Sequence, residues 1–148
     1  MLKLKSLVED FWKWTGLAED QWYVTDISVL TMDPLYYPNF DKLRRLCISK
    51  INTPMDHIET NLFLLCMGLD NEEELILDKC KSIGNAIFLE QIVSFGVSYP
   101  QGEPRWQIAE LLSVLLPRGK RYLQSLLEDS NPYVRKRARN VIDDSCKE

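Results

Sequence analysis

Apolar residues recur three and four positions apart along most of this chain, the spacing that lines one face of an α-helix. Few stretches alternate apolar and polar residues in the way that half-buried strands do. Prolines, glycines and capping side chains divide the pattern into short segments. The sequence therefore predicts an all-α protein, with helices over about residues 2–14, 22–30, 39–51, 53–67, 72–83, 86–95, 104–116, 120–127 and 133–145.

Capping signals set several of these boundaries. Thr53 precedes a proline, and a hydroxyl N-cap followed by proline at the first helical position favours a helix start. Gly68 is expected to end that helix as a left-handed C-cap. Asp70 or Asn71 is expected to cap the next helix, whose first turn would hold the acids of residues 72–74.

Residues 22–30 (WYVTDISVL) admit two interpretations. Their β-branched and aromatic side chains favour a strand. A strand needs a partner, and no other segment of the chain is patterned as one. We therefore predict a helix here, with a strand as the alternative.

The helices that follow capped turns each carry a small residue near the middle. These residues lie 33, 29 and 29 positions apart, at Cys47, Cys80, Ala109 and Ala138. A small side chain lets neighbouring helices approach closely, so the spacing predicts an internal repeat of stacked helix pairs. The alternative is that small residues are common enough to fall near these positions by chance.

The C-terminal stretch LLEDSNPYVRKRARNVID resembles a HEAT repeat. One helix ends, a turn containing Asp129 follows, and the next helix begins with Val134 and Arg135. The segment LRRLC at residues 43–47 resembles a degraded copy of the same pattern, whereas the units around Cys80 and Ala109 lack the arginine.

This resemblance implies the architecture of the whole chain. We expect a single domain over residues 1–148, built as a short right-handed solenoid of antiparallel helix pairs. Residues 1–38 would form an N-terminal cap, and residues 39–148 the HEAT-like repeats. In that family the turn aspartate and the early arginine hold adjacent repeats in register. The resemblance thus implies structural roles for Asp129 and Arg135, beside Ala109 and Ala138 at the repeat interfaces.

Composition narrows the class of protein. The 148 residues are 45% hydrophobic and 27% charged, with a net charge of −4, which excludes a disordered chain and disfavours a general nucleic-acid binder. No apolar run is long enough for a secretion signal or a membrane span. The cysteines lack metal-ligand spacing, and three lie in apolar helical patterns, so we expect inert thiols in a cytoplasmic protein.

The sequence offers little for catalysis. His57 is the only histidine, near the expected start of a helix, and no serine or cysteine motif accompanies it. The six glycines are scattered and form no phosphate-binding loop. We therefore predict a protein that is not an enzyme and that uses neither a cofactor nor a metal.

Charge placement points to binding instead. Between Lys50 and Lys79 the chain carries seven acids and no lysine or arginine: Asp56, Glu59, Asp70, Glu72, Glu73, Glu74 and Asp78. A solvated acidic face is one interpretation; the other is a surface that attracts a basic partner. Aromatic residues gather between residues 11 and 40, and Tyr36 and Tyr37, in a loop bounded by prolines, are candidates for an interface.

Small acidic cytoplasmic chains without catalytic residues are similar in type to bacterial toxin-immunity proteins, which neutralise toxins that are often basic nucleases. We therefore predict a non-catalytic protein-binding module of the immunity class, whose acidic surface would bind and neutralise a basic, nuclease-type toxin. The alternatives are a scaffold or adaptor, or a nucleic-acid-binding HEAT-like protein. The latter would use the basic cluster of the last helix, formed by Arg135, Lys136, Arg137 and Arg139.

Overall fold

The computed structural model describes residues 3–146, and all the regular structure in that range is helical, which confirms the all-α prediction. Three short 3₁₀ turns, Glu19–Gln21, Ile27–Val29 and Pro34–Tyr36, lie between the first two α-helices. No helix in the described range has both the length and the apolar character needed to cross a membrane. The α-helices are α1 (Leu4–Thr15), α2 (Phe40–Ser49), α3 (His57–Leu69), α4 (Leu75–Ile83), α5 (Ala86–Gly96), α6 (Gly102–Leu115), α7 (Lys120–Leu127) and α8 (Pro132–Ser145).

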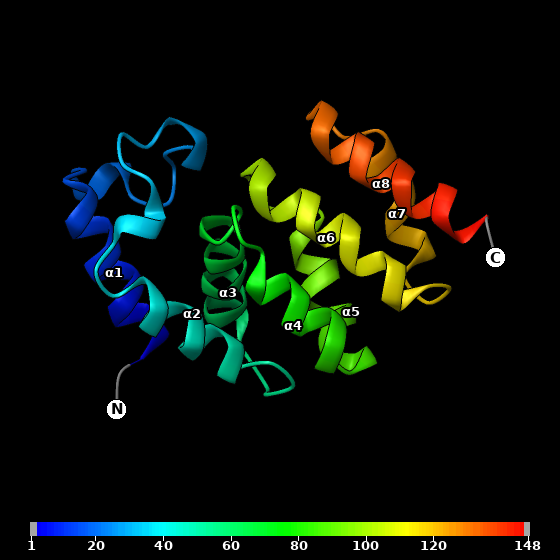
Figure 1. Cartoon of the computed structure of the whole chain (residues 1–148), viewed down its shortest axis with the longest axis horizontal. Coiled ribbons are helices and arrows are strands. Elements are labelled where there is room, and N and C mark those ends of the chain that lie inside the picture. The colour runs from blue at the N-terminus through cyan, green and yellow to red at the C-terminus, as the bar shows by residue number, and fades with distance from the viewer. Residues whose placement is uncertain (1–2, 147–148) are drawn as a thin grey trace.

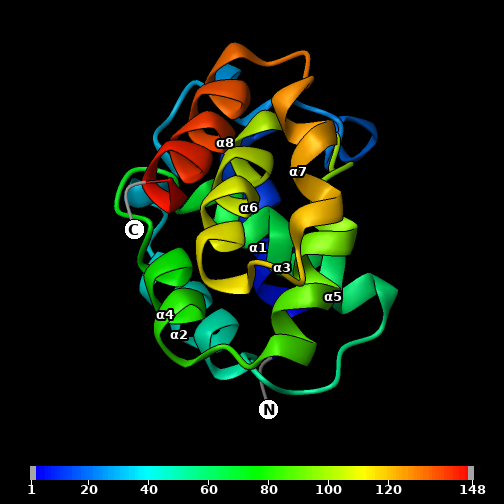
Figure 2. The same cartoon turned by 90° about the vertical axis from the view of Figure 1, so that its right-hand side faces the viewer.

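The even-numbered helices form one row, and most of the odd-numbered helices lie beside it (Figures 1 and 2). Helix α2 contacts α4, α4 contacts α6, and α6 contacts α8. Beside this row, α1 contacts α3, and α3 contacts α5. Because each helix packs mainly on near neighbours in this order, α1 and α8 lie at opposite ends of the longest axis (Figure 1).

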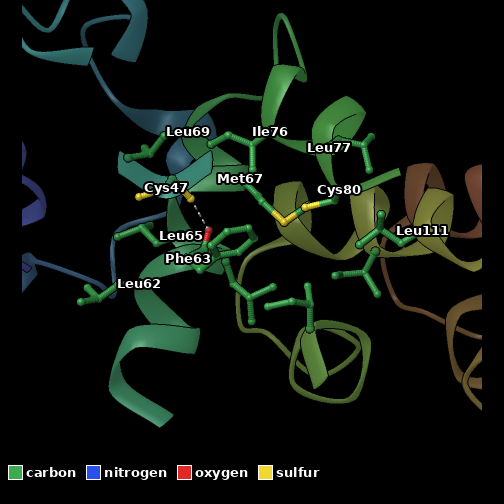
Figure 3. Close-up of a cluster of buried hydrophobic side chains, with 14 of the residues drawn as sticks. Cys47, Leu62, Phe63, Leu65, Met67, Leu69, Ile76, Leu77, Cys80 and Leu111 are labelled. Carbon is green, nitrogen blue, oxygen red and sulfur yellow. Dashed lines mark hydrogen bonds between the residues drawn. The ribbon is translucent and has the colours of Figure 1, made fainter. Parts of the chain in front are cut away.

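The core runs through the centre of this arrangement, between α2, α3, α4 and α6 (Figure 3). Helix α3 is buried nearly all round, with every residue from 62 to 69 shielded from solvent. One small residue of each even-numbered helix is completely buried, as the proposed repeat requires. These residues are Cys47, Cys80, Ala109 and Ala138.

The predicted buried thiols are confirmed at three positions. Cys47, Cys66 and Cys80 are buried and unbridged, and Cys146 is exposed. The Cys47 thiol donates a weak hydrogen bond to the carbonyl oxygen of Phe63 at 3.9 Å (Figure 3). Burial raises the pKa of Cys47 well above its ordinary value and that of Cys80 to about 12. These thiols therefore stay protonated and act as small apolar side chains.

The prediction of a helix or a strand over residues 22–30 is wrong. The segment is irregular apart from the turn Ile27–Val29. The Asp26 carboxylate accepts the N–H of Ser28 at 3.0 Å, and such a local hydrogen bond favours a turn over a continuing helix. Tyr23 adopts a φ of 64°, a left-handed conformation that neither a helix nor a strand contains.

The predicted limits of the third helix are also wrong. Asp56, and not Thr53, caps α3, because its carboxylate accepts the N–H of Glu59 at 2.8 Å. Gly68 lies inside the helix instead of ending it. A Cβ at this position would lie 2.8 Å from Pro104 and 2.9 Å from Ile27, so close approach of α6 and the N-terminal segment explains the glycine.

The start of α4 differs from its prediction as well. Residues 72–74 precede the helix instead of forming its first turn, and Glu74 takes a left-handed φ of 53° at the boundary. Asp70 still provides a hydrogen-bond acceptor for the first turn of α4, although it lies six positions earlier in the sequence: its Oδ2 accepts the N–H of Ile76 at 2.9 Å. Elsewhere the predicted helices are confirmed with small shifts: α2 ends at Ser49, α6 begins at Gly102 and α8 begins at Pro132.

Candidate binding surfaces

Asp70 is an interior residue with no exposed surface. Its Oδ1 accepts hydrogen bonds from Arg44 Nε at 3.1 Å and Nη2 at 2.7 Å. Burial raises the pKa of the Asp70 carboxyl, and the N–H of Ile76 and the Arg44 guanidinium offset that effect in part. Asp70 thus joins α2 to the start of α4. Because it is buried, it cannot contact a partner, contrary to the prediction.

Glu74 was predicted to contact a basic protein, and Arg137 to contact nucleic acid in the alternative interpretation. The structure joins these two side chains to each other. Arg137 on α8 donates to Glu74 Oε1 from Nη2 at 2.5 Å, and it lies 3.6 Å from Glu110 on α6. Burial lowers the pKa of Arg137, but hydrogen bonds to Glu74 and Tyr133 raise it above its ordinary value. This interaction ties α8 to the start of α4, so neither side chain is available to a partner.

The other five acids of the predicted surface do not form one patch. Asp56 caps the start of α3, and Glu59 on its first turn faces Lys50 at 3.5 Å. Glu72 and Glu73 follow the opposite end of α3, about 20 Å away along a helix of that length. Asp78 is exposed on α4. The acid-only stretch in the sequence is therefore distributed over both ends of a buried helix.

Tyr36 and Tyr37 are adjacent in sequence but have different environments. Tyr36 is 78% exposed, whereas Tyr37 is 3% exposed and packs on Phe11. The Tyr37 hydroxyl donates a short hydrogen bond to the carboxylate of Asp10. Burial and this hydrogen bond raise the pKa of Tyr37 to about 12. Tyr37 is thus part of the core, and Tyr36 alone remains as a candidate contact.

Tyr36 and Glu73, both in the predicted set, line one surface hollow of about 370 Å³, here called the Tyr36 hollow. At its base lies Arg44, whose guanidinium is 4.8 Å from the centre of the Phe40 ring. Asp41 and Glu73 each lie 3.5 Å from this guanidinium. With Asp70 beneath it, Arg44 faces three carboxylates, so the hollow carries a net negative charge. The complete lining is Leu35, Tyr36, Tyr37, Pro38, Phe40, Asp41, Arg44 and Glu73.

The segment that leads to this hollow is a larger feature that the sequence analysis missed. Residues 14–41 contain no lysine, arginine or histidine. In Figure 1 much of this segment rises above α1 and α2 at the end of the molecule farthest from α8. We call its exposed side chains the N-terminal surface: the acids Glu19, Asp20, Asp26, Asp33 and Asp41, and the apolar residues Tyr23, Val24, Val29, Met32 and Tyr36.

A charge count could have found this surface. Residues 1–38 were predicted to form an N-terminal cap, in which most of the aromatic residues between positions 11 and 40 would be covered. Several of these aromatic residues are indeed buried or half-buried, including Trp14 and Trp22. The acids between them are exposed because the irregular backbone turns every few residues, which no helical periodicity describes.

The four basic residues of the last helix divide between its two sides. Arg137 faces inward toward Glu74, as described above. Arg135, Lys136 and Arg139 line a groove of about 260 Å³ on the other side, together with Pro132, Asn140 and Asp143. Arg135 also donates from Nη1 to the carbonyl oxygen of Asp129 at 2.6 Å.

Asp129 itself binds an arginine of α6. Its carboxylate accepts Arg105 Nε at 2.9 Å and Nη2 at 3.0 Å, which joins the turn before α8 to the start of α6. Arg135 thus contacts its own turn, and Arg105, which the sequence analysis did not name, is the arginine that joins Asp129 to α6. These contacts show how the turn is held, and they leave the outer donors of Arg135 facing the groove.

His57 occupies the exposed start of α3, and its ring packs edge-on against Phe95 with centroids 4.9 Å apart. Within residues 3–146, no three histidine, cysteine or acidic side chains gather as metal ligands would.

The chain matches no protein-family model, no curated protein and no solved structure.

Proposed function

We propose that this protein is a non-catalytic, cytoplasmic protein-binding module that holds a basic protein through its N-terminal surface and the Tyr36 hollow. The observation that carries the proposal is the segment 14–41, which exposes five acids and five apolar side chains and contains no basic residue. Exposed aromatic and apolar side chains are typical anchors of protein interfaces. The surrounding acids favour a basic partner and increase its rate of association.

The partner that fits this surface best is a nuclease-type toxin, which would make the protein an immunity protein. The active cleft of a nuclease is basic because it binds phosphates. Acids placed around apolar anchors can occupy such a cleft and exclude the nucleic acid. A scaffold or adaptor would use the same surface, and the activity of the bound partner distinguishes the two roles.

The proposed architecture is a short right-handed solenoid of HEAT-like helix pairs. Its support is a contact that occurs twice: Arg44 on α2 binds Asp70 before α4, and Arg105 on α6 binds Asp129 before α8. In both cases an arginine of one even-numbered helix holds the turn that leads to the next. The buried small residue in each even-numbered helix is consistent with close stacking of the pairs.

The proposal is tested with the natural partner, isolated by affinity capture and then purified. The variant Glu19→Lys/Asp20→Lys/Tyr36→Ala changes three exposed residues for which the structure shows no side-chain ion pair or hydrogen bond. We expect its affinity for the partner to fall by at least about tenfold, as for loss of an interface anchor with its surrounding charges. Titration calorimetry measures this loss, and circular dichroism checks that the helices remain.

Glu72→Lys/Asp78→Lys is the matched control, because it makes the same charge change at two exposed acids of the originally predicted set. The control should bind nearly as well as the unaltered protein. If the control loses affinity and the N-terminal variant does not, the N-terminal surface is the wrong site. A partner nuclease that remains active in the complex contradicts the immunity role.

A further inference from the structure

Three cations on the outer side of α8 have no carboxylate partner. Within the described part of the chain, Arg135, Lys136 and Arg139 form no ion pair. Four other arginines each lie within 3 Å of a carboxylate oxygen: Arg44, Arg105, Arg121 and Arg137. The outer side of α8 is therefore a concentration of positive charge that the fold does not use internally.

These cations lie along one continuous stripe. The residues that line the groove recur three and four positions apart, so they follow one face of the helix. From Pro132 to Asp143 the stripe extends about 16 Å, enough for two or three consecutive phosphates of an extended strand. Asn140 adds an amide donor, and Asp143 adds a negative charge at the far end. The basic part of the groove is thus nearer the start of α8.

Arg135 is oriented before any ligand binds. Its Nη1 donates to the Asp129 carbonyl at 2.6 Å, and two hydrogen bonds from Arg105 hold the Asp129 carboxylate in turn. Among residues 3–146, only one of the five N–H donors of Arg135 has a hydrogen-bond partner. A guanidinium fixed in this way presents its remaining donors in the planar arrangement that phosphate oxygens accept.

We propose that this groove binds the phosphate backbone of a nucleic-acid strand, without reading its sequence. Three cations, one amide and no aromatic side chain line it, so phosphates can be bound but bases have no ring on which to stack. Pro132 is its only apolar member, which leaves no anchor for a protein partner. The inference rests on α8 alone and does not depend on the proposed role of the N-terminal surface.

The test is fluorescence anisotropy of the full-length protein with a labelled single strand of DNA of mixed sequence. We expect the strand to bind at low salt. A plot of the logarithm of the association constant against the logarithm of salt concentration should fall with a slope of about −2 for three phosphate contacts. The variant Arg135→Gln/Lys136→Gln/Arg139→Gln should lose most of the affinity and nearly all of the slope. A strand of unrelated sequence should bind equally well.

A matched control separates the groove from the overall charge. Lys42→Gln/Arg45→Gln/Arg118→Gln removes the same three charges from exposed positions outside α8. It should keep its affinity within roughly twofold, because exposed charges act weakly beyond a Debye length. Equal loss in both variants would assign the binding to net charge and overturn the proposal, as would the absence of salt-dependent binding.

Sedimentation of the protein alone completes the test. If the unaltered chain self-associates and the groove variant does not, the groove contacts the acidic end of a second copy, and the nucleic-acid proposal is overturned. A monomer in both cases, together with the expected anisotropy results, supports the phosphate groove.

Discussion

The two ends of the molecule differ in backbone, charge and exposed chemistry. At the N-terminal end, the irregular segment 14–41 contains no basic residue, and it exposes apolar side chains among acids. The C-terminal end is a regular helix, capped by Asn131, whose outer side exposes cations and almost nothing apolar. Between them most of the charges bind one another, as Arg137 binds Glu74 and Arg105 binds Asp129. The two ends thus expose opposite chemistry: acids around apolar side chains at one end, and cations without an apolar anchor at the other.

The largest effect is expected from separating the buried ion pair near the N-terminal end. Arg44→Met leaves the completely buried carboxylate of Asp70 without its counter-charge. We expect the free energy of unfolding to fall by about 3–5 kcal/mol, as for other buried pairs that lose one partner. Urea denaturation measures the change.

Arg45→Met is the matched control for this variant, because Arg45 is exposed on the same helix. A surface change of this type should cost less than about 0.5 kcal/mol. Equal losses for the two variants would show that the Arg44–Asp70 contact does not hold α2 against the start of α4.

At the C-terminal end, Ala138→Leu should disturb the packing of α8 on α6. Ala138 is completely buried, and three extra carbon atoms at this position have no space without movement of the helices. We expect a loss of about 1–3 kcal/mol, typical of overpacking. Thermal unfolding followed by circular dichroism measures it. Asn140→Leu, which introduces the same leucine side chain at an exposed position of α8, should leave the thermal unfolding transition nearly unchanged.

The two neighbouring tyrosines allow a smaller comparison within the N-terminal end. Tyr37→Phe removes the part-buried hydrogen bond to Asp10 and should cost about 0.5–1.5 kcal/mol. Tyr36→Phe removes an exposed hydroxyl and should have no measurable effect on stability. Denaturation curves for the two variants check the difference, and a reversed order would mean that Tyr36 is the packed residue.

The smallest expected effect is a pH dependence of stability. It arises from Glu103 on α6, where this helix meets the N-terminal segment. Glu103 is buried near Asp26, and its Oε2 has no hydrogen-bond partner among the described residues. Burial raises the pKa of its carboxyl, Asp26 raises it further, and Arg105 lowers it in part. The folded state thus retains a proton that the unfolded chain releases as the pH rises above about 4.3.

Because the folded state binds this proton more tightly, the contribution of Glu103 to stability is present at low pH and declines as the pH rises from about 4 through the raised pKa. The neutral variant Glu103→Gln should not show this decline. Its gain in stability over the unaltered chain should therefore be larger at pH 7 than at pH 4, as measured by urea denaturation. If the stability difference between Glu103→Gln and the unaltered chain is equal at pH 4 and pH 7, the pKa of Glu103 is not raised in the folded state.

Local signals in the sequence predicted a good part of the fold. The helical periodicity located the α-helices after residue 39, and the helices predicted from residues 86 and 133 begin close to those positions. Asn85 and Asn131 precede them, and their side chains accept backbone N–H groups. The errors concern residues with two possible roles. Gly68 was interpreted as a helix end, but it permits α6 to approach, and that neighbour is 36 positions away in sequence at Pro104.

The candidate site was less predictable, because exposure and pairing depend on neighbours distant in sequence. Tyr36 and Glu73 were predicted as contacts and do line one hollow. Asp70 and Glu74 belonged to the same acidic stretch, yet Arg44 and Arg137 bind them from other helices. No property of the stretch itself distinguishes these two acids from the exposed Glu72 between them.

The sequence by itself determined the helical class, the buried cysteines and the uneven distribution of charge, because periodicity and composition are local properties of the chain. Only the tertiary structure decided which charges remain at the surface. An ion pair such as that of Glu74 with Arg137 joins residues 63 positions apart, and the packing of α8 against the rest of the row brings them together. The two surfaces that we propose for partners lie at the two ends of this row (Figure 1).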